Sequence, residues 1–168
     1  MRIAILTVSD RSFRGERADA SGPALVEAVL AQGWQITATL VVPDDLPQIA
    51  AQLTQWADSG KVDVILTTGG TGFSPRDITP EATSAVIQRP APGLAEAMRQ
   101  ARLRLTLHAM RSRGVAGIRQ RTLIVNLPGS PRAAAENLAV ILPVLPHAVQ
   151  LLAEDPQAEQ GHRPASSA

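Results

Sequence analysis

The sequence predicts an α/β fold, a three-layer α/β/α sandwich around a mostly parallel (mixed) sheet. Short apolar runs rich in β-branched residues alternate with segments of helical spacing. The first and third runs are apolar nearly throughout, which is typical of strands covered on both faces by helices. The order β-α-β-α-β-α-α-β-α then favours a single layered domain over residues 1–153. Residues 154–168 are rich in Gln, Glu, Pro, Ser and Ala and are predicted to form a disordered tail.

The first third of the chain predicts two strands and two helices. In order, these are a strand at 3–8, a loop at 11–19, a helix at 20–32, a strand at 34–42 and a helix at 46–59. Polar and apolar residues alternate in the second strand, which predicts an edge position with one wetter face. Gly33 and Gly60 follow the two helices and are natural C-terminal stops.

A third strand leads into the most informative stretch of the chain. The apolar run 62–66 continues into Thr67-Thr68-Gly69-Gly70-Thr71-Gly72. Glycines allow positive φ and a close approach of backbone to a ligand. A helix start follows, with Thr79 as N-cap and Pro80 at N1. Strand, glycine turn and helix start together predict an anion site, although a turn of this kind also occurs with no function beyond turning.

The second half of the chain predicts a second strand-to-helix turn. The elements in order are a helix at 79–88, a loop at 89–93, a helix at 94–108, short strands at 116–119 and 122–126, and helices at 133–142 and 144–152. Between the last strand and helix lies Leu127-Pro128-Gly129-Ser130-Pro131, with Ser130 as N-cap and Pro131 at N1. In a parallel sheet, both turns would lie at the same edge.

Asp44 and Asp77 are the candidate acidic pair, because each follows a strand and a parallel sheet would bring both to one rim. Two carboxylates beside a phosphate-binding turn fit Mg²⁺ bridged to substrate phosphates, since this ion uses few protein ligands. The alternative for Asp44 is a helix N-cap before Leu46, and Asp77 could cap the turn before Thr79. Asp45, next to Asp44, leaves open which carboxylate would meet a metal.

Other polar side chains near the predicted turns could bind an anion. Arginine suits bidentate phosphate contacts, and serine hydroxyls can donate. The candidates are Arg11, Arg76, Arg111, Arg113, Ser9, Ser112 and Ser130. Each arginine could equally be a solvated surface residue, and Ser130 could serve only as a cap. The three histidines share no ligand spacing, and no nucleophile with a neighbouring base is visible, so an attacking group would belong to the substrate.

Composition narrows the class of protein. The net charge of +1 gives no electrostatic argument for nucleic-acid binding. The chain has no cysteine, which excludes disulfides and thiolate catalysis and fits a cytoplasmic setting. No signal peptide is expected at the N-terminus. The apolar stretch 138–153 contains Pro143 and Pro146, and we expect it to be too short and too broken to span a membrane.

Taken together, these motifs resemble one known family. The quoted signatures are Thr67-Thr68-Gly69-Gly70-Thr71-Gly72, Arg76-Asp77-Ile78-Thr79-Pro80-Glu81-Ala82 and Asn126-Leu127-Pro128-Gly129-Ser130-Pro131, with Ser9-Asp10-Arg11 and Val42-Pro43-Asp44-Asp45. They look like those of the molybdenum cofactor biosynthesis MoaB/Mog family, over roughly residues 2–153. Each motif alone is weak, and the set is specific.

The resemblance implies a function and a set of site residues. Mog-type members are molybdopterin adenylyltransferases, which use Mg²⁺ and ATP to adenylate the terminal phosphate of molybdopterin and release pyrophosphate. The family's essential acids map onto Asp44 and Asp77, as catalytic and metal-binding residues. Its phosphate and nucleotide turns map onto Gly69, Gly70, Thr71 and Gly72, and onto Pro128, Gly129 and Ser130, with Ser9 nearby. Arg76 and Ser112 are the candidates for contact with the pterin substrate.

The resemblance also implies partners and leaves alternatives open. Family members are commonly homotrimers, or hexamers built from trimers, and other molybdenum cofactor enzymes are expected partners. No nucleic-acid or membrane partner is expected. The alternatives to an enzyme are a non-catalytic molybdopterin-binding or carrier homologue of the same fold, and an oligomeric interaction module. The sequence does not distinguish a molybdenum pathway from a tungsten pathway.

Overall fold

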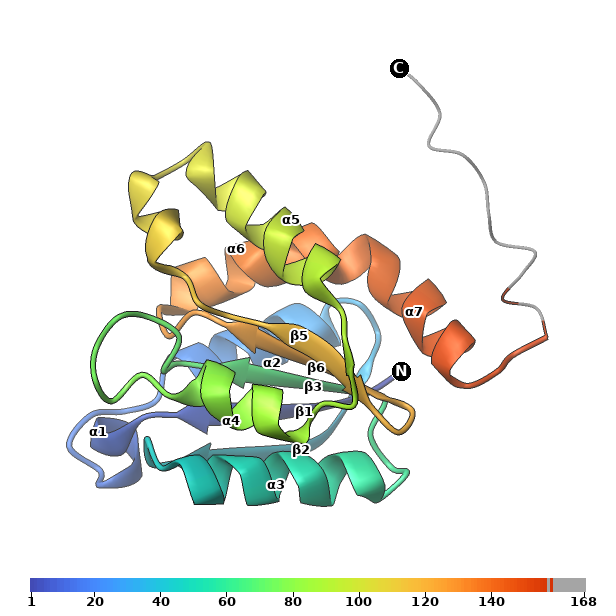
Figure 1. The fold of residues 1–168 in the computed structure, drawn as a ribbon, viewed down its shortest axis with the longest axis horizontal. Coiled ribbons are helices and arrows are strands. Elements are labelled where there is room, and N and C mark those ends of the chain that lie inside the picture. Colours follow the sequence, from blue (N-terminus) through green and yellow to red (C-terminus); the bar gives the residue numbers. More distant parts are fainter. Residues whose placement is uncertain (157, 159–168) are drawn as a thin grey trace.

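The structure is a computed structural model, and it describes residues 1–156 and 158. One mixed sheet lies between two layers of helices (Figure 1). The strands are β1 (Arg2–Val8), β2 (Gln35–Val42), β3 (Val64–Thr68), β4 (Arg89–Pro90), β5 (Ala116–Arg119) and β6 (Thr122–Leu127). The helices are α1 (Asp10–Phe13), α2 (Ser21–Leu30), α3 (Leu46–Asp58), α4 (Thr79–Val86), α5 (Pro92–Leu103), α6 (Pro131–Ile141) and α7 (Leu145–Leu152), with short 3₁₀ helices η1 (Leu107–Arg111) and η2 (Leu142–Val144).

The sheet has the order β2-β1-β3-β6-β5-β4. The pairs from β2 to β6 are parallel, whereas β5 pairs antiparallel with both β6 and β4. The mostly parallel, mixed sheet and the edge position of β2 are therefore confirmed. Thr7 pairs with Thr68 and Thr68 with Leu127, so β1, β3 and β6 end at one rim. Every predicted turn with candidate site residues leaves the sheet at this rim.

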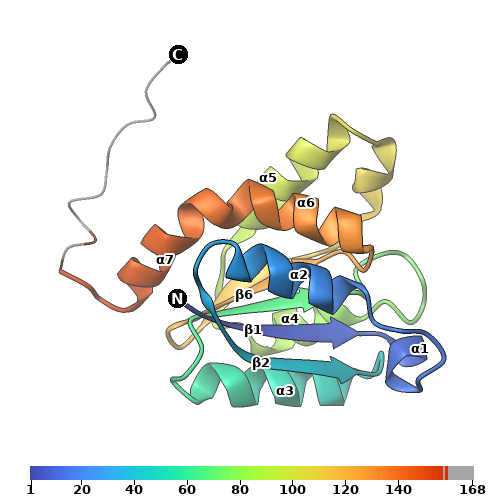
Figure 2. The ribbon, with the colours of Figure 1, turned by 180° about the vertical axis from the view of Figure 1, so that it is seen from behind.

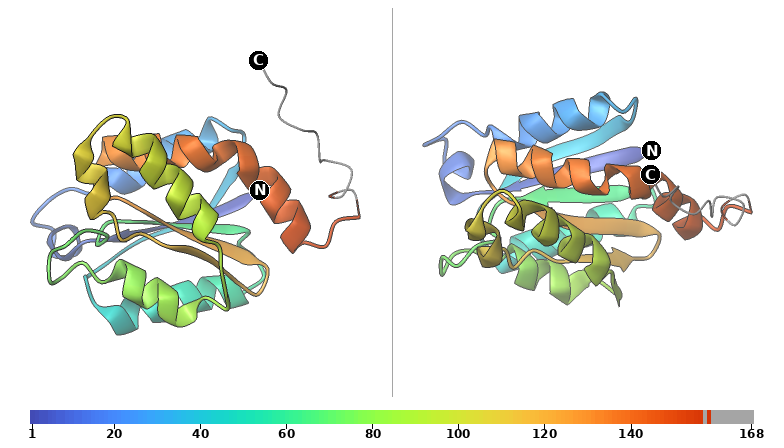
Figure 3. Two further views of the ribbon diagram at one scale, coloured as in Figure 1. Left: turned by 45° about the horizontal axis from the view of Figure 1, so that its top comes forward. Right: turned by 90° about the horizontal axis from the view of Figure 1, so that it is seen from above.

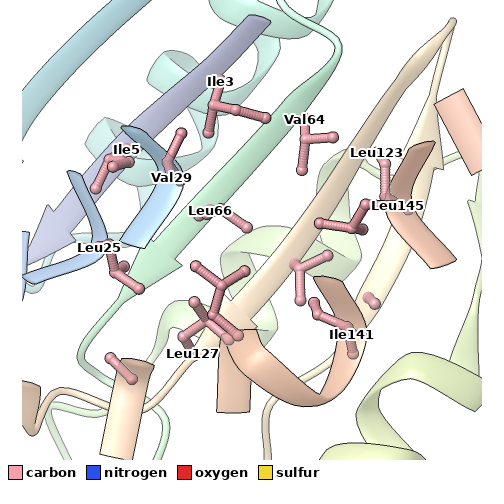
Figure 4. Packing of buried hydrophobic residues seen from close by; sticks show 14 of the residues in the cluster. Ile3, Ile5, Leu25, Val29, Val64, Leu66, Leu123, Leu127, Ile141 and Leu145 are labelled. Atoms are coloured by element: carbon pink, nitrogen blue, oxygen red, sulfur yellow. The ribbon is translucent and has the colours of Figure 1, made fainter. Parts of the chain in front are cut away.

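The strands carry core residues on both faces, as the apolar runs predict. Ile3 and Ile5 face the layer of α2, α5, α6 and α7, whereas Ala4 and Leu6 face α3 and α4. Figures 2 and 3 show these two helical layers on opposite sides of the sheet. Figure 4 shows the hydrophobic cluster on the face covered by α2, α5, α6 and α7, in which residues of β1, β3 and β6 pack against helices of that layer.

Apart from shifts of one or two residues at element ends, three predicted segments differ from the structure. The loop predicted at 11–19 contains the short helix α1, because the Ser9 hydroxyl accepts a hydrogen bond from the Ser12 amide and caps it. The loop predicted at 89–93 contains β4 and the start of α5, where Pro92 is the first residue. The helix predicted at 94–108 ends at Leu103, and a separate 3₁₀ helix, η1, follows with Thr106 as its N-cap.

The segment Pro131–Leu152 consists of α6, η2 and α7 in direct succession. It is 22 residues long and contains an 18-residue window with a mean hydropathy of 1.4, enough by length and composition alone to cross a membrane, so the expectation that the apolar stretch 138–153 is too short does not hold. The same test is passed by core helices of soluble proteins. Leu138, Ile141 and Leu145 belong to the buried cluster against the sheet, as apolar residues of a core helix do. Figure 4 shows Ile141 and Leu145 in this cluster.

The predicted tail lies mostly outside the described residues. Of residues 154–168, the structure describes only 154–156 and 158. The division into a domain at 1–153 and a tail therefore stays a prediction.

An ion pair ties the starts of β1 and β3 together at the end of the sheet opposite the rim. The Asp63 carboxylate accepts hydrogen bonds from the Arg2 amide at 2.7 Å and from the Arg2 guanidinium at 2.6 and 3.1 Å. Burial alone would raise the pKa of Asp63, but these hydrogen bonds and the charge of Arg2 hold it below its ordinary value. The ionised carboxylate is thus favoured in the folded state.

We predict that Asp63→Asn destabilises the protein near neutral pH by about 1 kcal/mol, because charged hydrogen bonds are lost while Arg2 stays partly solvated. A lowered carboxyl pKa contributes stability above the ordinary value of 3.8 and loses it as pH falls through the folded-state pKa. The difference between wild type and variant should therefore shrink below about pH 4. Urea unfolding at pH 7 and pH 3 measures this difference in the free energy of unfolding. Glu16→Gln, in the exposed Arg14–Glu16 pair, is the control and should change little; an equal loss there would contradict the prediction.

Candidate active site

The turn after β3 is built so closely that two of its positions exclude a side chain. Gly69 and Gly70 have φ values of 101° and 62°, in the left-handed region. A Cβ on Gly69 would lie 2.2 Å from the Val8 carbonyl oxygen, and one on Gly70 would lie 2.4 Å from Thr79 Oγ1. Both glycines are therefore required by backbone conformation and by the lack of space.

The first residue of α4 holds this turn from below. The Thr79 amide donates to the Gly70 carbonyl at 3.1 Å, and the Thr79 hydroxyl donates to the Gly69 carbonyl at 2.9 Å. The predicted role of Thr79 as N-cap is wrong: Ile78 occupies that position, and its side chain makes no capping hydrogen bond. The hydroxyl is used on the turn because the carbonyls of both glycines point toward α4.

The second turn packs directly on the first. A Cβ on Gly129 would lie 3.1 Å from the Gly69 Cα. The Gly69 amide donates to the Leu127 carbonyl at 3.2 Å, and the Thr68 hydroxyl donates to the Pro128 carbonyl at 2.8 Å. The two turns are thus one unit. Ser130 caps α6 as predicted, accepting from the Ala133 amide at 3.5 Å with Pro131 at N1.

A buried amide supports the unit from inside the core. Asn126 donates from Nδ2 to the Thr67 and Thr83 hydroxyls at 3.0 and 2.8 Å, and its Oδ1 accepts from the Val115 amide at 3.2 Å. Asn126, Thr67 and Thr83 are all buried. Because buried polar groups are costly when unpaired, this network fixes β6, β3 and α4 relative to one another beneath the turns.

The two neighbouring aspartates after β2 make different hydrogen bonds. Asp45 caps α3, accepting from the Gln48 amide at 3.0 Å. Asp44 is not the cap, so that alternative is wrong. Its Oδ2 accepts from the Asp10 amide at 2.8 Å, and its Oδ1 lies 3.1 Å from the position a Gly70 Cβ would take. Asp44 is therefore the carboxylate that faces the glycine turn.

Asp77 reaches the glycine turn from the other side. Its Oδ2 accepts from the Ser74 amide at 2.8 Å and lies 2.8 Å from the position a Gly72 Cβ would take. The side chain thus closes its own turn, as the capping alternative anticipates, and also faces Gly72. Arg113 donates to the carbonyls of Gly72 and Asp77, which holds the two ends of this loop together.

Negative charge is concentrated at the rim. The pKa of Asp44 is raised, first by burial and then by the negative charges of Asp10 and Asp77, against the hydrogen bond from the Asp10 amide and the charge of Arg76. For Asp10, burial opposes ionisation, but the hydrogen bonds from Arg76 and from the Asp44 amide lower its pKa. Carboxylates that repel one another are a common property of cation sites.

Beside the turns lies an open cavity of about 610 Å³, bounded on the far side by α5, η1 and α6. Its lining from the two turns includes most of the predicted residues: Gly70, Thr71, Gly72, Asp77, Pro128, Gly129 and Ser130. Ser112 and Arg111 line it from the end of η1. The amides of Gly70, Thr71 and Gly72 donate to no other group in the described part of the chain, so they can bind an anion.

Six predicted candidates lie outside this lining: Ser9, Arg11, Asp44, Gly69, Arg76 and Arg113. Arg11 is exposed on α1, and Arg113 is used on the loop that carries Asp77. Gly69 forms the back of the turn, and Ser9 caps α1 at the adjacent strand end. Asp44 stands beside the turn rather than in the cavity wall. Arg76 binds Asp10 through Nε and Nη2, so its predicted substrate contact remains a prediction.

Sequence reasoning predicted Arg111 and Ser112 but missed the rest of the far wall. Arg99, Arg102, His108 and Asn137 also line the cavity. Arg99 and Arg102 are three residues apart on α5 and so share one helix face, a signal that was available in the sequence. Arg102 pairs with Glu136, and Arg99 donates to the Gly114 carbonyl at 2.9 Å.

Comparison with known proteins assigns this arrangement to a family. Residues 4–147 match the family described as "Probable molybdopterin binding domain". The chain belongs to this family. The resemblance seen in the sequence motifs is thereby confirmed, and it places the chain in molybdenum cofactor biosynthesis.

Named relatives cover the chain almost end to end. Gephyrin of Dictyostelium discoideum is 44% identical over 173 residues, covering 96% of this chain but 24% of gephyrin, so the chain spans about a quarter of that protein. A molybdopterin adenylyltransferase of Helicobacter pylori (strain J99) is 39% identical over 155 residues, with coverage of 90% and 88%. The crystal structure of the molybdopterin biosynthesis enzyme MoaB from Thermus thermophilus is 53% identical with a TM-score of 0.87, covering 92% of this chain and 98% of that one. The predicted fold is confirmed.

The packed turns generate a stability prediction. Gly69→Ala should lose about 3 kcal/mol or more, because alanine is strained at positive φ and its methyl group would overlap the Val8 carbonyl. Gly33→Ala is the matched control, since Gly33 also has a positive φ of 72° but has nothing within 4 Å of an added Cβ. It should lose only about 1 kcal/mol. Equal losses in urea unfolding would show that crowding at the turn contributes nothing.

Proposed function

We propose that this chain is a molybdopterin adenylyltransferase, transferring AMP from ATP to the phosphate of molybdopterin with release of pyrophosphate. The observation that carries the proposal is the pair Asp44 and Asp77 set against the glycine turn at the cavity, in a chain about 40% identical to proteins of that name. Relatives of comparable length assign the chain to enzymes of the adenylyltransferase type. ATP and molybdopterin are accordingly the proposed substrates.

The acidic pair fits Mg²⁺ bound together with substrate phosphates. Among the described residues no group of three or more His, Cys, Asp or Glu side chains could hold a metal ion alone. Mg²⁺ needs no such group, because it binds through one or two carboxylates, substrate phosphates and water. Asp44 Oδ1 and the Asp77 carboxylate are the ligands proposed, and the ion would supply neutralisation of phosphate charge.

The chain's own residues would then position the substrate phosphates and neutralise their charge. The unpaired amides of Gly70, Thr71 and Gly72 would cradle a phosphate group, and the turn at Pro128, Gly129 and Ser130 would border the same cavity. An oxygen of the molybdopterin phosphate would attack the α-phosphorus of ATP as the bond to pyrophosphate breaks. Because this nucleophile is already ionised near neutral pH, placement and electrostatics suffice and no protein base is required.

The far wall of the cavity is basic, which suits the negatively charged second substrate, molybdopterin. Arg111, Ser112 and Arg99 line the cavity, and the Arg113 amide, next to Ser112, donates to the Thr71 carbonyl at 3.0 Å. We propose that this wall, together with Ser112, contacts the pterin substrate. A homotrimer or hexamer of trimers, which the family resemblance implies, and a cytoplasmic location, which fits a chain with no cysteine, belong to the same proposal.

The first experiment measures pyrophosphate release from ATP and Mg²⁺, with and without molybdopterin. Wild type should release pyrophosphate only with molybdopterin. Asp44→Asn and Asp77→Asn should each lower the rate by roughly a hundredfold or more, the size of loss found when one charge-stabilising group leaves a catalytic site.

Asp45→Asn is the matched control for Asp44→Asn. Asparagine caps helices as well as aspartate does, so this variant should keep both the fold and the rate. Loss of activity in Asp45→Asn but not in Asp44→Asn would reverse the assignment of the two acids. A folded wild-type protein that binds molybdopterin without releasing pyrophosphate would instead support the carrier alternative.

A further inference from the structure

Arg76 and Asp10 form an ion pair between two separate segments at the rim. Arg76 Nε donates to Asp10 Oδ2 at 3.0 Å, and its Nη2 donates to Oδ1 at 3.0 Å and Oδ2 at 2.8 Å. Arg76 belongs to the loop that carries Asp77, whereas Asp10 begins α1 directly after β1. The pair therefore bridges the loop to the end of the central sheet.

Asp10 is joined to Asp44 by a reciprocal pair of hydrogen bonds. The Asp10 amide donates to Asp44 Oδ2 at 2.8 Å, and the Asp44 amide donates to Asp10 Oδ1 at 3.0 Å. Each carboxylate thus holds the backbone of the other residue. This exchange fixes the side chain of Asp44 so that its Oδ1 faces Gly70.

The combined contacts make a continuous chain from Asp44 through Asp10 and Arg76 to the neighbouring Asp77. As an isolated surface pair, Arg76–Asp10 would contribute little, since the Arg76 side chain is 63% exposed. Its location gives it another use. It neutralises the carboxylate of Asp10 beside that of Asp44, and it draws the loop of Asp77 toward β1.

We propose that Asp10 and Arg76 are positioning residues that set the separation of Asp44 and Asp77, so that both can engage one cation. The inference rests on the proposed function for its consequence, and its structural content can be tested separately. Arg113 anchors the same loop independently of Arg76, through the carbonyls of Gly72 and Asp77. Loss of Arg76 should therefore loosen the loop without unfolding the protein.

The test uses Arg76→Met and Asp10→Asn in the full chain, with Mn²⁺ as the probe. Binding of Mn²⁺ in the presence of ATP is followed by electron paramagnetic resonance. Each variant should weaken it by about tenfold, the effect expected when a residue that orients a metal ligand is removed. Amides of residues 72–77 should also exchange hydrogen faster in both variants, with no ligand added.

The sign of the effect in Arg76→Met separates positioning from charge. Removing a positive charge near Asp44 and Asp77 should tighten cation binding if only electrostatics mattered. Weaker binding together with faster exchange of 72–77 in the absence of ATP therefore supports the geometric role, whereas weaker binding with unchanged exchange would point to a lost ATP contact and overturn it. Unchanged or tighter Mn²⁺ binding in Arg76→Met would overturn the proposal, as would a loss confined to Asp10→Asn, which would make Asp10 itself a ligand. Arg76→Met should cause no further loss in the Asp10→Asn background.

Arg119→Met is the matched control. Arg119 makes a similar two-bond pair with Asp58, at 2.8 and 2.7 Å, at the opposite end of the sheet. It should leave Mn²⁺ binding and the exchange of 72–77 as in wild type, and an equal change there would show a global effect and overturn the proposal. If wild type binds Mn²⁺ and ATP but releases no pyrophosphate, the proposed function fails while the binding and exchange data still decide the positioning role.

Discussion

The contact between two backbone turns is the constraint on which the rest of the site depends. Gly69 lies against the Val8 carbonyl on one side and against Gly129 on the other, with no room for a side chain at Gly69 and little at Gly129. Such contact is possible only because β1, β3 and β6 are parallel neighbours that end at one rim. The buried Asn126 network holds that spacing from below, so the geometry of the turns is set by the core rather than by the loops themselves.

From this constraint follows the placement of the acids. Asp44 and Asp77 approach the glycine turn from β2 and from the loop before α4, and each carboxylate lies where a side chain on Gly70 or Gly72 would be. The glycines thus serve two purposes, because their conformation shapes the turn and their missing side chains admit the carboxylates. Substitution of Gly72 would displace Asp77 even though Gly72 has an ordinary φ.

Much of the fold and the position of the glycine turns could be predicted from the sequence, because these features depend on local patterns. Apolar runs predicted the strands, alternation predicted the edge position of β2, and the glycine turns predicted the rim. Hydrogen-bond partners between segments could not be predicted. The capping role of Asp45 was available locally, because Asp45 directly precedes Leu46 and lies three residues before Gln48, whereas the contact of Asp44 with the Asp10 amide was not. The local sequence predicts Thr79 as a helix cap, but its hydroxyl donates to the Gly69 carbonyl instead. Arg99 and Arg102 line the cavity only because α5 folds over the turns.

The raised pKa of Asp44 shows that the arrangement of acids at the rim disfavours ionisation of this carboxylate. Burial and the neighbouring charges of Asp10 and Asp77 all disfavour the ionised form, and Arg76 offsets them only in part. Between the ordinary carboxyl pKa and the raised one, the folded state binds more protons than the unfolded chain, so this group's contribution to stability falls as pH rises through that range. A cation shared by the acids would remove much of that repulsion. Binding and folding would then be linked, because the ligand would stabilise the folded state at the point where its charges are least balanced.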